Sequence, residues 1–306
     1  MQKRKLGQSD LFVSEIGLGC MSLGTNEANA HRVINAAFEE GINYFDTADL
    51  YDFGVNEQIV GSALKKVRDQ VVIATKVGNR WNDDKCGWSW DPSKAYIKEQ
   101  VKQSLKRLGT DYIDLYQLHG GTMEDRIEES IEAFEELKSE GFIRYYGISS
   151  IRPNVIREYV EKSSIVSVMM QYSLLDRRPE ESAIPLLAQH EISIVCRGTL
   201  AKGILTEKKW DDFSTSIKEK GYLDYSSSEL MNLLYSLEEK LSGRTLTEVA
   251  TQYCLSDPTV ATVVAGASSP EQVRKNVQSA QSQVLSKEEL GLLRQITKRS
   301  VYKDHR

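Results

Sequence analysis

Eight short segments of this chain are rich in β-branched and other apolar residues, with little alternation between polar and apolar positions. A half-exposed strand alternates, whereas a parallel strand covered on both faces is apolar almost throughout. The eight expected strands are residues 14–19, 44–48, 71–76, 113–119, 143–149, 167–173, 193–198 and 261–266. The sequence therefore predicts a parallel sheet that is covered on both faces.

Helical patterns fill most of the intervals between these strands. Apolar residues recur three or four positions apart, and several of these stretches end at a glycine. The expected helices are 26–40, 93–108, 124–140, 152–162, 179–190 and 270–281. Most strand starts lie roughly 25 to 40 residues apart, the length of one βα unit. The longest interval holds an insertion, 207–228, and then a helix pair that ends near Asp257.

Eight βα units in succession indicate an α/β protein with a (β/α)8 TIM barrel. An open, doubly wound sheet has the same local pattern but usually fewer strands. Residues 2–6 and 11–14 flank a turn, which predicts an N-terminal β-hairpin that plugs the bottom of the barrel. No linker rich in proline, glycine or serine divides the chain, so we expect one barrel domain over residues 1–306.

Composition excludes several classes of protein. The formal net charge is −5, from 39 Lys+Arg and 44 Asp+Glu, and no basic stripe stands out, so we expect no nucleic-acid partner. No apolar run is long enough for a membrane span, and no signal peptide is visible, so we expect a cytoplasmic protein without a membrane partner. The four cysteines are scattered, which favours reduced thiols, and neither they nor the four histidines have metal-ligand spacing.

Four ionisable side chains stand at the ends of neighbouring expected strands. Asp46 lies near the end of the second strand and Tyr51 in the loop after it, while Lys76 and His119 end the third and fourth strands. Each has an ordinary explanation taken alone, as a turn residue, a solvated lysine, a core histidine or a packing aromatic. Together they fit the carboxyl-terminal mouth of a barrel, where active sites are built, because burying uncompensated charge for packing alone is costly.

These residue types favour carbonyl reduction. A lysine ammonium beside a tyrosine phenol stabilises the phenolate, which makes the tyrosine a proton donor, and Asp46 is expected to pair with Lys76. His119 supplies a second hydrogen bond to a developing oxyanion. No side chain supplies hydride, so a nicotinamide cofactor and a small-molecule carbonyl substrate are implied. A metal-dependent hydrolase needs several ligands around an ion, and only His119 among the histidines ends a strand, so we expect no metal.

The motifs around these residues resemble those of the aldo-keto reductase family. FDTADLY contains Asp46 and Tyr51, ATK ends at Lys76 and YQLH ends at His119. GLGCMSLGT, RLGTDYIDL, GFIRYYGIS, QYSLL and GASSPEQVRKNV complete a match, in order, over essentially the whole chain. Loop lengths resemble the bacterial branch that is also similar to potassium-channel β subunits. The resemblance implies an NADPH-dependent reductase of aldehydes and ketones, with a cofactor-sensing regulatory subunit on the same fold as the alternative.

The resemblance also implies which residues hold NADP(H) across the barrel mouth. Cys20, Met21 and Asp46 are expected near the nicotinamide, and Ser149 and Gln171 at its carboxamide. The segment with Arg197, Gly198, Leu200 and Lys202, followed by Lys208, is expected beside the nicotinamide and pyrophosphate. Gly266, Ala267, Ser268, Gln272 and Asn276 are expected at the adenosine 2′-phosphate, where a small-residue turn opens a helix at Pro270 and presents backbone N–H groups.

Two positions depart from the family pattern. Ser150 stands where the family often has asparagine, and Arg197 stands where a tyrosine usually stacks on the nicotinamide. A guanidinium can stack on a planar ring, and a second cation there favours reduced over oxidised cofactor. We therefore expect cofactor binding to persist with changed affinity.

The substrate side is less defined by sequence. Trp81, Trp88 and Trp90 follow the third strand, with Asp83, Asp84 and Lys85 among them. They predict either a packed Ω-loop or an aromatic wall over the substrate, for which Trp81 is the candidate beside Tyr51 and His119. The 207–228 insertion is expected to form a mobile flap over the cofactor. The basic tail 298–306 is expected to be frayed, with a reach to the substrate mouth as the alternative. A monomer is favoured, although the sequence leaves the subunit count open.

Overall fold

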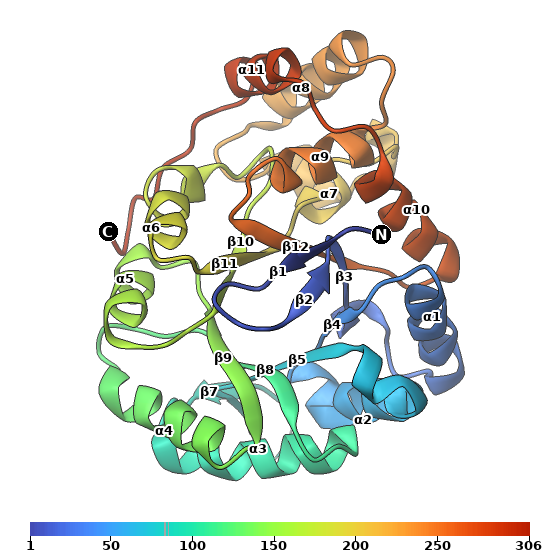
Figure 1. Ribbon diagram of the computed structural model, residues 1–306. Helices are drawn as coiled ribbons and strands as arrows, with labels where there is room; N and C mark the ends of the chain where they lie inside the picture. The colour runs from blue at the N-terminus through green and yellow to red at the C-terminus, as the bar shows by residue number, and fades with distance from the viewer. Residues whose placement is uncertain (83, 85) are drawn as a thin grey trace.

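A closed barrel of eight parallel strands forms the centre of the protein, as predicted. The computed structural model describes residues 1–82, 84 and 86–306. Every expected strand corresponds to a barrel strand, with ends shifted by up to two residues. Around the barrel they are β3 (Ile16–Gly19), β4 (Tyr44–Asp46), β5 (Val72–Val77), β8 (Ile113–Leu118), β9 (Ile143–Ser149), β10 (Ser167–Gln171), β11 (Ser193–Arg197) and β12 (Val260–Gly266), and β12 pairs with β3 (Figure 1).

Helices surround the barrel and bury their apolar faces against the outer side of its strands. The six expected helices correspond to α1 (Glu27–Glu39), α3 (Lys94–Leu108), α4 (Ile127–Ser139), α5 (Pro153–Lys162), α6 (Ala183–Gln189) and α10 (Pro270–Gln281). The expected helix pair corresponds to α8 (Ser227–Lys240) and α9 (Leu246–Leu255). The structure adds α2 (Val55–Leu64), α7 (Thr215–Lys220) and α11 (Lys287–Ile296).

Helix α2 completes the unit between β4 and β5, and the sequence pattern missed it for a physical reason. Asn56 and Glu57 are fully buried in its first turn, so the helix has no clean apolar stripe. Gly61 allows α2 to pack closely on α3, because a Cβ atom there would lie 2.1 Å from the carbonyl oxygen of Leu108. The close crossing explains why a residue with low helix propensity stands mid-helix.

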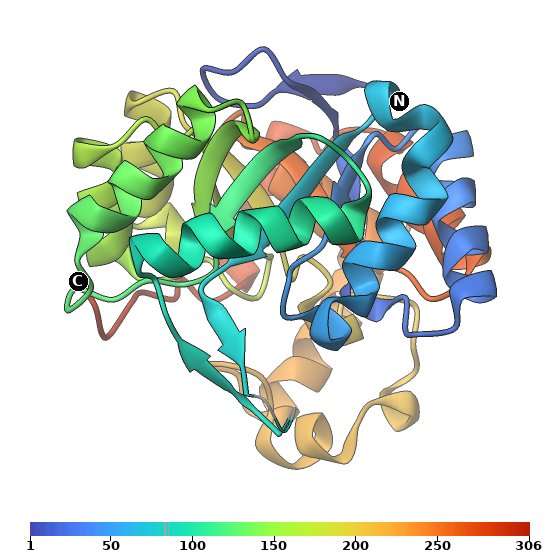
Figure 2. The same cartoon turned by 90° about the horizontal axis from the view of Figure 1, so that it is seen from below.

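The N-terminal hairpin closes one end of the barrel, as predicted. Strands β1 (Lys3–Lys5) and β2 (Phe12–Ser14) pair antiparallel and lie across that end (Figure 2). Leu6, Leu11 and Val13 are buried in a second apolar cluster with inward-facing residues of the barrel strands. The hairpin thus plugs the bottom of the barrel with apolar side chains and leaves the opposite end for the site.

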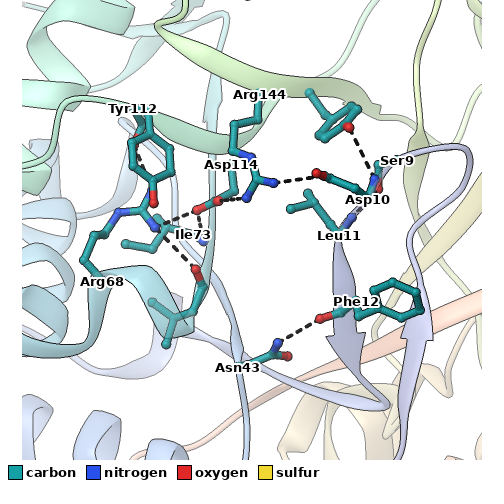
Figure 3. A network of polar contacts seen from close by, with 12 residues as sticks. Ser9, Asp10, Leu11, Phe12, Asn43, Arg68, Ile73, Tyr112, Asp114 and Arg144 are labelled. Atoms are coloured by element: carbon teal, nitrogen blue, oxygen red, sulfur yellow. Dashed lines mark hydrogen bonds and ion pairs between the residues drawn. The ribbon is translucent and has the colours of Figure 1, made fainter.

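Ion pairs anchor the hairpin loop to the barrel (Figure 3). Asp114 on β8 is 1% exposed at its side chain and pairs with Arg68 at 2.8 Å and with Arg144 at 3.0 Å. Arg144 also reaches Asp10 in the loop at 2.9 Å. One Asp114 oxygen accepts a hydrogen bond from the backbone N–H of Ile73 on β5. A buried carboxylate therefore joins β5, β8, β9 and the hairpin.

Two segments project beyond the other end of the barrel (Figure 2). One is a second hairpin of β6 (Asn79–Trp81) and β7 (Trp88–Trp90), and the other is the 207–228 insertion with α7. Within the insertion Phe213, Tyr222 and Tyr225 are buried, so these aromatic residues pack into the fold.

Among the described residues no helix is both long and apolar enough to cross a membrane. Cys20, Cys196 and Cys254 are buried free thiols and Cys86 is an exposed one, as the scattered cysteines suggested.

Candidate active site

The carboxyl ends of β4, β5 and β8 bring the four predicted site residues together. Lys76 Nζ lies 2.5 Å from Asp46 Oδ1 and 3.5 Å from the Tyr51 hydroxyl oxygen. The rings of Tyr51 and His119 meet edge to face, with centroids 6.0 Å apart. All four residues line one cavity of about 800 Å³. Adjacent strands in register, with β4, β5 and β8 paired in that order, are sufficient to produce this convergence.

Lys76 is fully buried and charged. Burial alone would lower the pKa of Lys76, but the Asp46 carboxylate and the Tyr51 hydroxyl outweigh it, so that pKa is raised. The ammonium donates to Asp46, to the backbone carbonyl of Thr47 at 2.7 Å and to Tyr51. An ammonium has three N–H donors, so these partners fix its orientation completely. Burial raises the pKa of Asp46. The Lys76 ammonium and, to a smaller extent, the hydrogen bond from the Gln117 amide lower it and offset part of this rise.

His119 is electrically neutral in this environment. Burial lowers the pKa of His119 to about 3, and the charges of Lys76 and Arg197 contribute in the same direction. Its Nδ1 atom is buried and has no hydrogen-bond partner among the described residues. A neutral imidazole offers one N–H donor to a ligand without adding positive charge.

The predicted cofactor residues fall into two groups. Met21, Asp46, Ser149, Arg197, Gly198 and Gly266 line the same cavity as Tyr51. The others do not line it: Cys20, Gln171, Leu200, Lys202, Lys208, Ala267, Ser268, Gln272 and Asn276. Except for Asp46, which ends β4, the first group lies on the β9, β11, β12 and β3 side of the mouth, whereas Tyr51 and His119 lie on the β4 and β8 side. One cavity therefore brings most of the lining residues expected to hold cofactor face to face with Tyr51 and His119.

Several residues outside the lining support it from behind. Cys20 is fully buried, and burial followed by the charge of Asp46 raises the pKa of its thiol. Gln171 donates to Asp176 at 2.8 Å, and its amide oxygen accepts from Arg197 at 3.2 Å. Gln171 thus contacts the unusual arginine directly and orients it.

The turn between β12 and α10 is closed by its own side chains. The backbone N–H of Ser268 donates to Gln272 Oε1, and Asn276 donates to the carbonyl of Gly266. A Cβ atom at Gly266 would lie 2.6 Å from the Ser22 hydroxyl, so the backbone there forms a narrow wall that only glycine allows without a shift. Ala267 is buried beneath this turn.

Lys202 and Lys208 belong to the segment that follows β11. Lys202 has a positive φ of 59° in a tight turn that begins after Leu200. The side chain of Lys208 folds over Gly203, where an added Cβ atom would lie 3.5 Å from Nζ. Both lysines therefore belong to the segment that leads away from Arg197 and Gly198 at the end of β11.

The tryptophan segment is a β-hairpin, so the packed Ω-loop alternative is wrong. Trp88 and Trp90 line the cavity, and Trp88 is 55% exposed. Trp81 is outside the lining and packs edge to face on Phe53. Asp83 and Lys85 lie outside the described residues. The aromatic wall thus consists of Trp88 and Trp90, whose alternate spacing places both on one face of β7.

Trp90 fits closely against the floor of the mouth. A Cβ atom would come within 2.6 Å of its ring at Gly78 and within 3.1 Å at Gly120. Its indole N–H donates to Asp125 Oδ1 at 2.9 Å. The glycines that follow β5 and β8 therefore allow the hairpin to lie against the ends of these two strands.

The C-terminal tail is packed at Ser300 and Tyr302, so the expectation of fraying is wrong for this part, whereas residues 303–306 are exposed. Tyr302 is buried with Arg178 over its ring, 5.1 Å from the centroid. The carbonyl of His305 accepts from the backbone N–H of Asn154. Sequence reasoning also missed Ile151 and Arg152, which come directly after β9 and line the same cavity as Tyr51. Their position in the loop that directly follows Ser149 could have indicated this in the sequence.

The arrangement is suited to an oxyanion and a planar cofactor. The side of the cavity formed by Gly198 and Gly266 has room for a nicotinamide cofactor beside Arg197. The buried Nδ1 of His119 has no hydrogen-bond partner among the described residues, so it could bond to a ligand. Among the described residues, no cluster of three histidine, cysteine or carboxylate side chains has the geometry to hold a metal ion.

Comparison with known proteins agrees with this geometry. Residues 15–298 match the Aldo/keto reductase family. The chain is 61% identical over 306 residues to the uncharacterized oxidoreductase YqkF of Bacillus subtilis (strain 168), with all of both chains covered. It is 33% identical over 302 residues to the NADH-specific methylglyoxal reductase of Escherichia coli (strain K12), covering 90% of this chain and 93% of that protein.

A solved structure gives the same result in three dimensions. The holo form of aldo-keto reductase AKR11C1 from Bacillus halodurans superposes with a TM-score of 0.95 at 57% identity, covering 100% of this chain and 99% of that one. The match extends through the barrel and its mouth, since it spans the whole chain. This protein is therefore an oxidoreductase that belongs to the aldo/keto reductase family.

Proposed function

We propose that the protein reduces aldehydes and ketones to alcohols with NADPH, and that Tyr51 donates the proton. The observation that carries this proposal is the buried, charged Lys76 at 3.5 Å from the Tyr51 hydroxyl, beside a neutral His119. When bound, a reduced nicotinamide supplies the hydride that no side chain can supply. The protein's own side chains bind the substrate carbonyl and supply the proton.

The substrate carbonyl oxygen is expected to bind between the Tyr51 hydroxyl and the His119 imidazole. Two neutral donors stabilise the negative charge that develops on this oxygen as the carbonyl carbon is reduced. Tyr51 then gives its proton to the oxygen, and the Lys76 ammonium stabilises the phenolate that is left. Asp46 and the Thr47 carbonyl hold Lys76, so its third N–H remains directed at Tyr51.

The cofactor side follows from the residues that line and support the mouth. Ser149 and Gln171 are proposed to hold the carboxamide, and Arg197 to contact the ring and pyrophosphate with Gly198, Leu200, Lys202 and Lys208. The turn formed by Gly266, Ala267, Ser268, Gln272 and Asn276 is proposed to hold the adenosine end, since a helix N-terminus favours an anion. A 2′-phosphate adds negative charge, which these lysines and this helix end favour.

A coenzyme titration followed by a carbonyl panel tests the proposal. We expect NADPH to bind at least about tenfold more tightly than NADH, and methylglyoxal or 4-nitrobenzaldehyde to be reduced with NADPH. The comparison with NADH is essential, because one relative is named as NADH-specific. Tight NADPH binding without turnover across the panel would instead favour a cofactor-sensing subunit.

A further inference from the structure

Arg152 lies where the catalytic cavity meets a second one. It follows β9 and precedes the first residue of α5. Arg152 and Ile151 line the catalytic cavity and also a neighbouring cavity of about 510 Å³, which the C-terminal tail encloses. A substrate that extends from Tyr51 along this side of the mouth therefore passes Arg152.

The guanidinium of Arg152 has donors to spare. Its Nη1 donates to the carbonyl of Gly121 at 2.7 Å, which fixes the side chain against the loop after β8. Its Nε and Nη2 atoms have no hydrogen bond or ion pair in the part of the chain that the structure describes. The pKa of Glu124 is lowered by hydrogen bonds from the Glu124 backbone and from Thr122, and then by the charge of Arg152. In the described part of the chain, however, no ion pair joins Glu124 to Arg152.

The other cations of the tail cavity are already engaged. Arg178 makes two hydrogen bonds of 2.7 Å to the carboxylate of Asp176. Lys303 pairs with Asp224 at 3.2 Å. Of the described lysines and arginines that line this cavity, Arg152 is thus the one without an ion pair, and a guanidinium matches a carboxylate in geometry as well as charge.

Two buried hydroxyls reinforce this preference. Ser300 and Tyr302 line the tail cavity, are 6% and 5% exposed, and have hydroxyl oxygens without a hydrogen-bond partner among the described residues. Buried polar groups normally have partners, so a cavity with two unpartnered hydroxyls is suited to a polar group of a ligand. Trp88 and Trp90 add apolar surface to the neighbouring catalytic cavity.

We propose that Arg152 is a specificity-determining residue that binds a carboxylate at the far end of the substrate. The substrate class is an aldehyde with an apolar spacer and a terminal carboxylate. The aldehyde lies at Tyr51 and His119, the spacer lies against the tryptophans, and the carboxylate lies at Arg152 near the tail hydroxyls. This inference rests on the proposed carbonyl reductase function.

The test compares 4-carboxybenzaldehyde with its methyl ester, which has a similar shape but no charge. With NADPH, Arg152→Met should lower the ratio of kcat/KM for the acid over the ester by about tenfold or more, because a charge-assisted hydrogen bond is lost. Most of the loss should be in KM. Arg152→Lys should recover part of it. The matched control is Arg157→Met, an exposed arginine on α5 that lines neither cavity, and it should leave the ratio unchanged.

Equilibrium binding separates this inference from the reductase proposal. Tryptophan fluorescence, with Trp88 and Trp90 in the cavity wall, reports titration with 4-(hydroxymethyl)benzoate without turnover. We expect Arg152→Met to weaken this binding about tenfold and added salt to reduce the difference. Equal binding by both proteins, or an equal loss for acid and ester, would overturn the role of Arg152. Failure to reduce either aldehyde, with Arg152-dependent binding intact, would count against the reductase proposal alone.

Discussion

Replacing Lys76 by methionine removes the buried ammonium on which the proposed proton transfer depends. Methionine has a similar length and fits an apolar site, whereas Lys76 is fully buried between Asp46, the Thr47 carbonyl and Tyr51. The substitution therefore tests the charge with little change in packing volume. We expect it to lower turnover strongly and also to destabilise the fold.

The catalytic magnitude follows from the distance between Lys76 Nζ and the Tyr51 hydroxyl. At 3.5 Å and an effective dielectric constant of about 20, an ammonium and a phenolate attract by about 5 kcal/mol. The Asp46 carboxylate contacts the same ammonium and repels the phenolate, which offsets up to about half of this. A loss of about 2–5 kcal/mol corresponds to a rate lower by about 30-fold to 5,000-fold.

Single-turnover reduction of 4-nitrobenzaldehyde by a preformed complex with NADPH measures this step directly. Circular dichroism and NADPH titration serve as controls for folding and cofactor binding. A variant that folds, binds NADPH and keeps a rate within about fivefold of the original protein would refute the argument that Lys76 stabilises the phenolate.

The stability of Lys76→Met should depend on pH through Asp46. Removing a buried partner typically costs about 3–5 kcal/mol. Burial raises the pKa of Asp46 above its ordinary value of 3.8, and without Lys76 less opposes that rise. Below about pH 4 the carboxyl is protonated in both states, so the penalty is absent; as the pH rises, the unfolded chain ionises first and stability is lost. Urea denaturation between pH 4 and 7 should show a larger fall in the variant than in the original protein, where the Lys76 ammonium opposes part of the rise in the Asp46 pKa.

Three further predictions use single substitutions. Tyr51→Phe should lower reduction by about 10²- to 10⁴-fold while NADPH affinity stays nearly constant, and activity within tenfold would contradict the proton-donor role. Asp114→Asn should lower the free energy of unfolding by about 3–5 kcal/mol in chemical denaturation, because it breaks the ion pairs of a buried carboxylate. The exposed Asp10→Asn should lower it by less than about 1 kcal/mol. Similar losses for the two variants would contradict this prediction. Because the pKa of His119 is about 3, the imidazole should stay neutral between about pH 5 and 8. The pH profile of turnover with a neutral aldehyde should therefore have no inflection in this range that depends on His119. An inflection that His119→Gln removes would show that the imidazole titrates.

Local pattern was sufficient for most of the barrel but failed where buried polar residues interrupt it. The eight strands are mostly apolar because a parallel strand in the barrel is covered on both faces, and that requirement is visible in sequence. Helix α2 was missed because Asn56 and Glu57 are buried in its first turn, with partners that come from other elements. The tail was expected to fray because nothing local shows that Arg178 covers Tyr302.

For the site, the sequence by itself determined which ionisable groups stand at the ends of consecutive strands. Asp46, Lys76 and His119 had to approach one another once their strands paired in parallel order. Only the tertiary structure decided that Lys76 is fully enclosed, that His119 is neutral, and that Arg152 borders two cavities. Charge state and free hydrogen-bonding capacity depend on burial and on neighbours that are distant in sequence, and no local pattern contains that information.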